Sequence, residues 1–274
     1  MEFLKGERKM ALIGAILGDI SGSQYEFTRL RPKDLDWQHV PLFTDKCRFT
    51  DDSLLSIATK DAILKNPDKP DFQTAYYEFG NKYYKCGFGG KFKEWLQSSN
   101  PQPYGSFGNG SAMRCSFIGE YYDDINEVTE KAKMSAEVTH NSPEGIKGAC
   151  ITAVCVWAAR HGKTKSEIFD YVKRFYEDPQ KYKYPITHTL RTIRPVYRWD
   201  VTCQGSVAPA VRCFLEADNW EGFMRNVMSL PCDLDTLGAI GGGMAEEFFK
   251  GTGQDDLAIL ERYLPQELMD IVLK

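Results

Sequence analysis

The sequence predicts an all-α fold, a single compact multi-helix domain spanning residues 1–274. Apolar residues recur at three- and four-residue spacing in about ten successive segments, as they do on the buried face of a helix. Several of these segments begin with residues that favour helix N-caps. No stretch shows the sustained alternation of apolar and polar residues that is typical of a half-buried strand. At 31.2 kDa, the chain is long enough to bury one substantial core.

The expected helices follow one another along the whole chain. They cover residues 10–20, 54–64, 71–84, a short piece around Trp95, 124–138, 144–160, 165–175, 204–215, 218–230, 237–248 and 257–272, the last split at Pro265. The first helix contains Gly14 and Gly18, whose small size lets a neighbouring helix approach closely. The segment 144–160 is apolar on most of its faces, which predicts a central position in the fold.

Local sequence signals indicate where several of these helices begin. Ser142 is a good N-cap for the central helix. Thr164 and Glu167 have the spacing of a capping box. Asp218 and Glu221 share that spacing, so Asp218 is expected to begin the helix that follows it.

Two long irregular segments are expected to be loops. Residues 28–49 contain prolines and mixed charges, and a loop of this length suggests a lid or a binding loop. Residues 178–200 are basic and aromatic, which is typical of a solvated surface or, as the second choice, of a partner-binding surface.

Composition excludes several classes of protein. A net charge of −4 and a pI near 5.7 give no general polyanion-binding character, so a nucleic-acid partner is not indicated. The eight cysteines contain no CxxC pair and are typical of the reduced cysteines of a cytoplasmic protein. Residues 1–10 are too charged for a signal peptide, and no apolar run is long enough to span a membrane.

Two expected helix starts share a pattern of two carboxylates and one hydroxyl. They are Thr50-Asp51-Asp52 and Asp233-Leu234-Asp235-Thr236. Oxygen atoms of these kinds are the ligands that Mg²⁺, Mn²⁺ and Ca²⁺ prefer, so two such starts facing each other could hold one or two cations. The same residues are also favoured in N-caps and first turns, which leaves a purely structural role open.

Two further features indicate ligand binding. The segment Gly108-Asn109-Gly110-Ser111-Ala112-Met113-Arg114 exposes backbone amides ahead of small residues, and such amides can hold a phosphate, although ordinary turns use the same residues. His140 falls at a corner between two expected helices, where either packing or ligand contact would explain it.

In this order, the motifs resemble those of the ADP-ribosylglycohydrolase family. The family comprises all-helical enzymes that include the dinitrogenase-reductase-activating glycohydrolase and the vertebrate ADP-ribosyl-acceptor hydrolases. The resemblance rests on the Gly18-Asp19 helix end with Glu26 downstream, the two acidic starts, the 108–114 loop and Thr139-His140. It implies a hydrolase that cleaves the glycosidic bond between ADP-ribose and an acceptor, which is an ADP-ribosylated protein, a nucleic acid or a small molecule.

The resemblance also implies a cofactor and a set of site residues. The cofactor would be two divalent metal ions, Mg²⁺ or Mn²⁺, that hold the distal ribose. The implied metal ligands are Thr50, Asp51, Asp52, Asp233, Asp235 and Thr236. The implied substrate-binding residues are Phe107, Gly108, Asn109, Gly110, Ser111, Met113 and His140, with Phe107 or Tyr104 against the adenine and His140 near the phosphates. The implied catalytic residues are Glu26, Asp52 and Asp235, with Glu26 in a loop that closes over the scissile bond.

The chain departs from the family pattern just before the second acidic start. Many members have two glycines where this chain has Pro231-Cys232, and Leu234 replaces a residue that is often small or hydroxylated. Proline restricts its own backbone and that of the preceding residue, so a reshaped turn or a narrowed site is expected. A catalytically silent ADP-ribose-binding protein on the same fold is therefore the alternative to a hydrolase.

Overall fold

The computed structural model describes residues 11–25 and 36–274, and it is all-α over those ranges. The helices are α1 (Ala11–Ser23), α2 (Asp51–Lys65), α3 (Phe72–Lys82), α4 (Gly90–Gln97), α5 (Ser116–Tyr121), α6 (Ile125–Glu137), α7 (Pro143–Arg160), α8 (Lys165–Tyr176), α9 (Leu190–Ile193), α10 (Cys203–Leu215), α11 (Trp220–Met228), α12 (Leu234–Phe249), α13 (Asp256–Tyr263) and α14 (Gln266–Val272), with a 3₁₀ turn, η2 (Asn109–Ser111). Within the described ranges, the only extended pairing is one antiparallel bridge between Gly108 and Thr202. The all-α prediction is confirmed.

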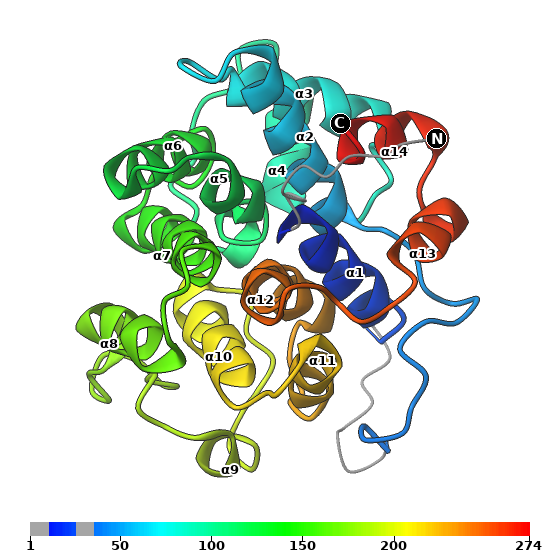
Figure 1. Cartoon of the computed structure of the whole chain (residues 1–274). Coiled ribbons are helices and arrows are strands. Elements are labelled where there is room, and N and C mark those ends of the chain that lie inside the picture. The colour runs from blue at the N-terminus through cyan, green and yellow to red at the C-terminus, as the bar shows by residue number, and fades with distance from the viewer. Residues whose placement is uncertain (1–10, 26–35) are drawn as a thin grey trace.

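Helices α1 and α12 lie side by side near the centre of the molecule (Figure 1). They run antiparallel, because Gly14 faces Gly242 and Gly18 faces Gly238. A Cβ atom at Gly14 would lie 2.5 Å from the carbonyl oxygen of Gly242, and one at Gly18 would overlap the backbone of Gly238. Any larger side chain would push the helices apart. The close approach predicted for the first helix is therefore real, and its partner is the glycine-rich helix near the end of the chain.

The antiparallel pair brings the C-terminal end of α1 to the N-terminal end of α12. A Cβ atom at Gly22 would lie 2.5 Å from the Cα atom of Asp235, so the two backbones are almost in contact there. The start of α2 packs against the same region of α1. Three helix ends that are distant in sequence therefore meet at one place.

The segment 144–160 forms α7, which packs against α5, α6, α10 and α12. Its middle residues, from Ile151 to Val156, are buried. The prediction of a central helix, made from its apolar character on most faces, is confirmed.

The local signals for helix starts were accurate in two cases and wrong by one residue in a third. Ser142 caps α7, and its hydroxyl accepts a hydrogen bond from the Gly145 N–H at 3.1 Å. Thr164 and Glu167 form the predicted capping box at the start of α8. Asp218 does not cap α11, because Asn219 takes that position and its side chain accepts a hydrogen bond from the Gly222 N–H at 2.7 Å. Starting the helix after Asn219 places Trp220 in the core, where it is fully buried.

The composition of segment 178–200 predicted a solvated surface, but the structure shows that only part of the segment is exposed. It contains the short helix α9, and Tyr184 and Tyr197 are buried with their rings stacked at a centroid distance of 4.3 Å. Trp199, by contrast, is 49% exposed. The alternation of basic and aromatic residues therefore combines core positions with surface positions.

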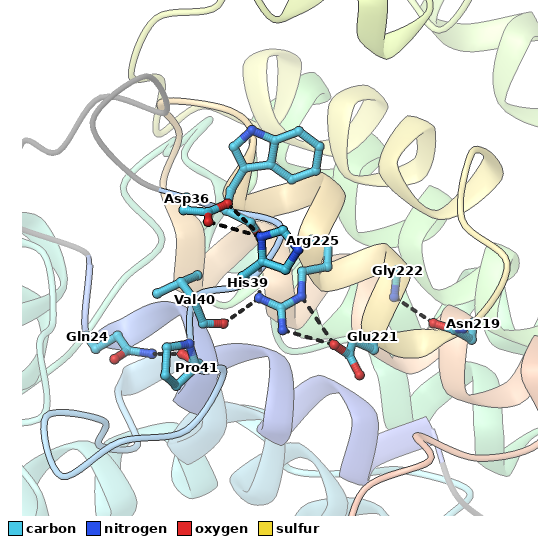
Figure 2. Close-up of polar contacts among 10 residues, drawn as sticks. Gln24, Asp36, His39, Val40, Pro41, Asn219, Glu221, Gly222 and Arg225 are labelled. Carbon is cyan, nitrogen blue, oxygen red and sulfur yellow. Dashed lines mark hydrogen bonds and ion pairs between the residues drawn. The ribbon is translucent and has the colours of Figure 1, made fainter.

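The part of the expected lid that the structure describes, residues 36–49, is held in place at two points. Figure 2 shows Arg225 of α11 donating to the carbonyl oxygen of Val40 and forming an ion pair with Glu221. On the other side, the Gln24 side chain donates to the carbonyl oxygen of Pro41 at 3.3 Å. These contacts fix the chain shortly before it enters α2.

None of the eight cysteines forms a disulfide, which agrees with the reduced state predicted for them. Among the described residues, the structure contains no helix with the length and apolar character needed to cross a bilayer.

Candidate metal and ligand site

A cavity of about 500 Å³ opens where the starts of α2 and α12 meet the loops between residues 87 and 114. Its lining residues are Asp51, Asp52, Leu55, Gly87, Gly89, Gly90, Lys91, Phe92, Tyr104, Ser106, Gly108, Asn109, Gly110, Met113, Arg114, His140, Trp199, Val201, Asp233, Asp235 and Thr236. The cavity thus joins both predicted acidic starts, the glycine loop and the predicted histidine.

Asp19, near the end of α1, organises the start of α2. It is fully buried, and its carboxylate accepts hydrogen bonds from the Thr50 N–H at 2.9 Å, the Thr50 hydroxyl at 2.7 Å and the Ser53 N–H at 3.0 Å, and also from the Ser53 hydroxyl. Burial raises the pKa of Asp19, and these hydrogen bonds oppose that rise. Asp19 therefore holds α2 against α1 and orients the residues that follow Thr50.

Asp52, in the first turn of α2, has a carboxylate oxygen without a partner. The residue is buried, and its Oδ2 atom lies 3.2 Å from the Thr50 hydroxyl and 3.4 Å from the Thr236 hydroxyl. Its Oδ1 atom has no hydrogen-bond partner among the described residues. Burial, and then the charges of three neighbouring aspartates, raise the pKa of Asp52 well above its ordinary value. A buried carboxylate oxygen with no donor indicates a position that a cation or a ligand fills.

The start of α12 supplies two more carboxylates. Asp233 accepts a hydrogen bond from the Asn109 side-chain amide at 2.9 Å, and the same amide lies 3.1 Å from the Ser206 hydroxyl. Burial raises the pKa of Asp233, and the hydrogen bonds from Asn109 and Thr236 oppose that rise. Asp235 is buried as well, and its Oδ1 atom accepts a hydrogen bond from the Thr236 N–H at 2.9 Å.

Three of these carboxylates form a cluster that fits a metal ion. One oxygen from each of Asp19, Asp52 and Asp235 lies within 4.8 Å of the others, and all three residues are buried. Buried like charges repel one another, and a divalent cation between them would remove that repulsion. Because every donor is an oxygen, the cluster suits a hard cation such as Mg²⁺, Mn²⁺ or Ca²⁺.

The structure brings most of the predicted site residues together. The predicted metal ligands Asp51, Asp52, Asp233, Asp235 and Thr236 line the cavity, and so do the predicted substrate-binding residues Gly108, Asn109, Gly110, Met113 and His140. Thr50 lies directly behind the cavity, between Asp19 and Asp52.

Two predicted substrate-binding residues do not line the cavity, and one predicted catalytic residue falls outside the described part of the chain. Ser111 is buried, and its hydroxyl donates to the carbonyl oxygen of Gly145 at 2.8 Å, so it supports the loop from behind. Phe107 is 54% exposed and does not line the cavity. Glu26 lies outside the described residues.

His140 is linked to Thr139 and, through Thr139, to Arg114. Its Nδ1 atom lies 2.7 Å from the Thr139 hydroxyl, which accepts a hydrogen bond from Arg114 at 3.1 Å. Burial, and then the positive charge of Arg114, lower the pKa of His140 well below its ordinary value. The imidazole is therefore neutral near pH 7.

Sequence patterns had not identified several residues at the site. Asp19 belongs to the carboxylate cluster, although only its place in the Gly18-Asp19 helix end had been noted. Gly87, Gly89, Lys91 and Trp199 also line the cavity. The closely spaced glycines after residue 86 were the one available signal for the first three of these, since glycines let a ligand approach the backbone.

The turn at Pro231-Cys232 does not remove the second acidic start from the cavity. Cys232 is buried, and its thiol lies 3.6 Å from the carbonyl oxygen of Val227. Asp233 and Asp235 still line the cavity, whereas Leu234 is buried and does not. Leu234 is therefore not among the residues that border the cavity, where it was expected to limit the space.

The fold and the site together define a class: an all-α protein in which carboxylates from three helix ends form a candidate cation site in a ligand cavity. The sequence model of the ADP-ribosylglycohydrolase family matches residues 6–245. The chain therefore belongs to the ADP-ribosylglycohydrolase family.

Comparison with individual proteins agrees with that assignment. The chain is 29% identical over 185 residues to the ADP-ribosylhydrolase ARH3 of Homo sapiens, which is 58% of this chain and 51% of that protein. It is 26% identical over 278 residues to ARH3 of Xenopus tropicalis, covering 83% of this chain and 77% of that protein. The match thus spans about half the length of the human relative.

Two other matches are a viral protein and a solved structure. A putative ADP-ribosyl glycohydrolase, L543, of Acanthamoeba polyphaga mimivirus is 26% identical over 195 residues, which is 61% of this chain and 59% of that protein. A solved structure described as an ADP-ribosylglycohydrolase-related protein complex superimposes with a TM-score of 0.72 at 20% identity, over 97% of this chain and 95% of that chain. At this identity, the structural match shows the shared fold.

Proposed function

We propose that the protein is a metal-dependent hydrolase that cleaves the glycosidic bond between ADP-ribose and an acceptor, and so removes ADP-ribosylation. The observation that carries the proposal is the unpartnered Oδ1 atom of buried Asp52, which lies beside Asp19 and Asp235 in a cavity lined by glycines. Membership of the family supports an ADP-ribose-containing substrate, such as an ADP-ribosylated protein.

The residues of the chain are suited to two tasks at the scissile bond. Cleavage at the anomeric carbon passes through an oxocarbenium-like state, which negative charge stabilises and which a positioned water then attacks. Asp52 and Asp235 place carboxylates where they can stabilise that charge, orient the water and accept its proton. Glu26 is proposed as a gate or as the general acid–base.

The proposed cofactor is a pair of Mg²⁺ or Mn²⁺ ions. The residues that would hold them are Thr50, Asp51, Asp52, Asp233, Asp235 and Thr236, to which the structure adds Asp19 as a neighbour of the same cluster. When bound, such ions would orient the ribose hydroxyls and supply Lewis-acid polarisation.

The remaining proposed contacts involve the phosphates and the base. Gly108, Asn109, Gly110, Met113 and His140 would surround the diphosphate, with Ser111 holding the loop in place. Phe107 or Tyr104 would pack against the adenine.

Calorimetric titration of ADP-ribose into the metal-free and the Mg²⁺- or Mn²⁺-loaded protein tests the binding half of the proposal. We expect binding that depends on the metal. Arginine-, serine- and nucleotide-linked ADP-ribose substrates then test turnover, and release of ADP-ribose from at least one of them is expected. Metal-dependent binding without any turnover would instead identify a silent ADP-ribose-binding protein, the alternative that the Pro231-Cys232 departure suggests.

A variant pair tests the role of the carboxylate cluster. Asp235→Asn should lower kcat/KM by about 100-fold or more, because it removes a charge next to the reacting centre while keeping the side-chain shape. Asp170→Asn, on the exposed face of α8, is the matched control and should leave turnover unchanged. Equal activity of the two variants, with unchanged circular dichroism, would contradict the assignment of Asp235.

A further inference from the structure

A line of polar contacts begins at Arg114 and ends at His140. Arg114 is completely buried, and its guanidinium stacks on the ring of Tyr76 at 4.2 Å. Its Nη2 atom donates to the carbonyl oxygen of Ser135 at 2.7 Å and to the Thr139 hydroxyl at 3.1 Å. The Thr139 hydroxyl oxygen lies 2.7 Å from His140 Nδ1.

The Thr139 hydroxyl can accept one of these hydrogen bonds and donate the other. A guanidinium can only donate, so the Thr139 oxygen must accept from Arg114. The single hydroxyl proton of Thr139 is then available for one acceptor, and the nearest is His140 Nδ1. The ring of Tyr104 also lies beside His140, at a centroid distance of 6.0 Å.

The consequence for the imidazole follows from its neutral state. A neutral histidine carries one ring proton, and when Nδ1 accepts the proton of the Thr139 hydroxyl, the ring proton resides on Nε2. That nitrogen faces the glycine loop, because Cβ atoms built at Gly110 and Gly108 would lie 3.3 Å and 3.5 Å from it. His140, Gly108 and Gly110 all line the cavity.

We propose that Arg114 and Thr139 are positioning residues that hold His140 as the Nε2–H tautomer, so that the ring donates a hydrogen bond to an anionic oxygen of the ligand beside the glycine loop. The ligand chemistry, a phosphate or diphosphate, rests on the function proposed above. The donor is neutral, so it binds the anion by a directed hydrogen bond without taking up a proton.

Nitrogen-15 NMR of the histidine rings in the free protein at pH 7 tests the tautomer directly, because the shifts of Nδ1 and Nε2 differ between a protonated and an unprotonated nitrogen. The protein has four histidines, and comparison with the His140→Gln variant assigns the His140 signals. The expected result is a protonated Nε2 and an unprotonated Nδ1. A protonated Nδ1 would overturn the proposal, and this measurement needs neither a ligand nor a metal.

Three variants then connect the tautomer to binding. Thr139→Val removes only the hydroxyl, so we expect a mixture of tautomers and ADP-ribose binding that is about 5- to 10-fold weaker in the metal-loaded protein. Thr139→Ser restores the hydroxyl and should restore both properties. Tyr104→Phe keeps the ring but removes the phenol hydroxyl, and it should leave the His140 tautomer unchanged.

Failure of this proposal and failure of the proposed function give different results. If the wild-type protein does not bind ADP-ribose while its spectrum shows the Nε2–H tautomer, the proposed function fails and the positioning of His140 stands. If the wild-type protein binds ADP-ribose and Thr139→Val, with its His140 tautomers mixed, binds equally well, the ligand contact assigned to His140 is wrong.

Discussion

Asn109 connects two helices at the candidate site through a single side chain. Its amide nitrogen reaches both the Asp233 carboxylate at the start of α12 and the Ser206 hydroxyl on α10. It lies in the glycine loop, where the sequence suggested direct contact with a substrate. The structure gives it a second contact, because it donates to Asp233, a proposed metal ligand, and such a donor fixes the orientation of a ligating carboxylate.

We expect Asn109→Ala to weaken Mn²⁺ binding by about tenfold or more, since Asp233 would lose the donor that holds it. Calorimetric titration of the metal-free protein with Mn²⁺ measures this change without any substrate. Ser206→Ala, which leaves the contact with Asp233 in place, should have a smaller effect. Equal losses in the two variants would show that Asn109 acts on the loop and not on Asp233.

Glu246 of α12 is a buried carboxylate outside the candidate site. Its side chain accepts a hydrogen bond from the Gly14 N–H, and its Oε1 atom has no hydrogen-bond partner among the described residues. Burial, and then the charges of Glu120, Asp256 and Glu247, raise its pKa well above the ordinary value. The ionised form is therefore disfavoured in the folded state.

We expect Glu246→Gln to raise the free energy of unfolding at neutral pH and to change it little near about pH 4. Because the pKa of Glu246 is raised in the folded state, the protonated side chain contributes to stability. This contribution is fully present below the pKa of the unfolded state and is lost as the pH rises through the pKa of the folded state. The gain in the free energy of unfolding should be about 1.4 kcal/mol for each pH unit between the pKa of Glu246 in the unfolded state and the pH of the measurement, up to the pKa in the folded state. Denaturant unfolding across this pH range measures it, with exposed Glu261→Gln as the control. Parallel pH profiles for wild type and Glu246→Gln would contradict the expectation.

Among the elements, the antiparallel pair of α1 and α12 depends on its glycines. The sequence suggested that something packs closely on α1, and only the fold identified α12 as the partner. Local signals likewise predicted the capping box at Thr164, whereas the start of α11 depended on burying Trp220, which is a tertiary effect. Local sequence signals thus predict that a helix forms, whereas the residue at which it begins can depend on packing.

Gly18→Ala should lower the free energy of unfolding by about 3 kcal/mol, because its methyl group would overlap the backbone of Gly238. Gly90→Ala is the matched control, since a Cβ atom there meets nothing within 4 Å and alanine favours the helix. Thermal and denaturant unfolding of both variants would check this. If the free energy of unfolding of Gly18→Ala were as little changed as that of Gly90→Ala, the two helices could move apart without a loss of stability.

The segment 36–42 is expected to depend on Arg225 of α11. Arg225→Met keeps most of the side-chain volume but removes the donors to the carbonyl oxygens of Val40 and Trp37, so stability should fall by about 1–3 kcal/mol. Glu221→Gln removes only the exposed ion pair and should cost less than about 1 kcal/mol. Denaturant unfolding distinguishes the two, and a larger loss for Glu221→Gln would contradict the role assigned to the carbonyl contacts.

At the scale of the whole molecule, the site was partly predictable because its polar residues form recognisable local patterns. Asp51 and Asp52, and likewise Asp235, stand at helix starts whose chemistry suggests a cation. Asp19 was noted only as part of the Gly18-Asp19 helix end, and Trp199 had no such pattern, because their place at the site depends on which helices and loops meet. The sequence therefore predicted residues in short motifs and missed those that only the fold brings into the cavity.

A divalent cation should stabilise the whole folded chain if the carboxylate cluster binds it. Stabilisation by a ligand that binds only the folded state follows mass action, and it reaches about 2.7 kcal/mol at a free concentration one hundred times the Kd. Thermal scans with increasing Mg²⁺ or Mn²⁺, matched in ionic strength with a monovalent salt, measure it. Asp52→Ala should abolish the shift, and a shift no larger than that with the monovalent salt would argue against a specific site.

The junction of α1 with α12 has a consequence for the order of events during protein synthesis. Asp19 is synthesised before Asp235, and residues 20–234 lie between them. Until α12 has been made, the glycine face of α1 has no partner, so the nascent chain must keep that face protected or unstructured. Because so many of its contacts join distant parts of the chain, folding should be slower than in a helical bundle built from neighbouring helices. A nascent chain that does not yet include Asp235 therefore lacks the complete carboxylate cluster.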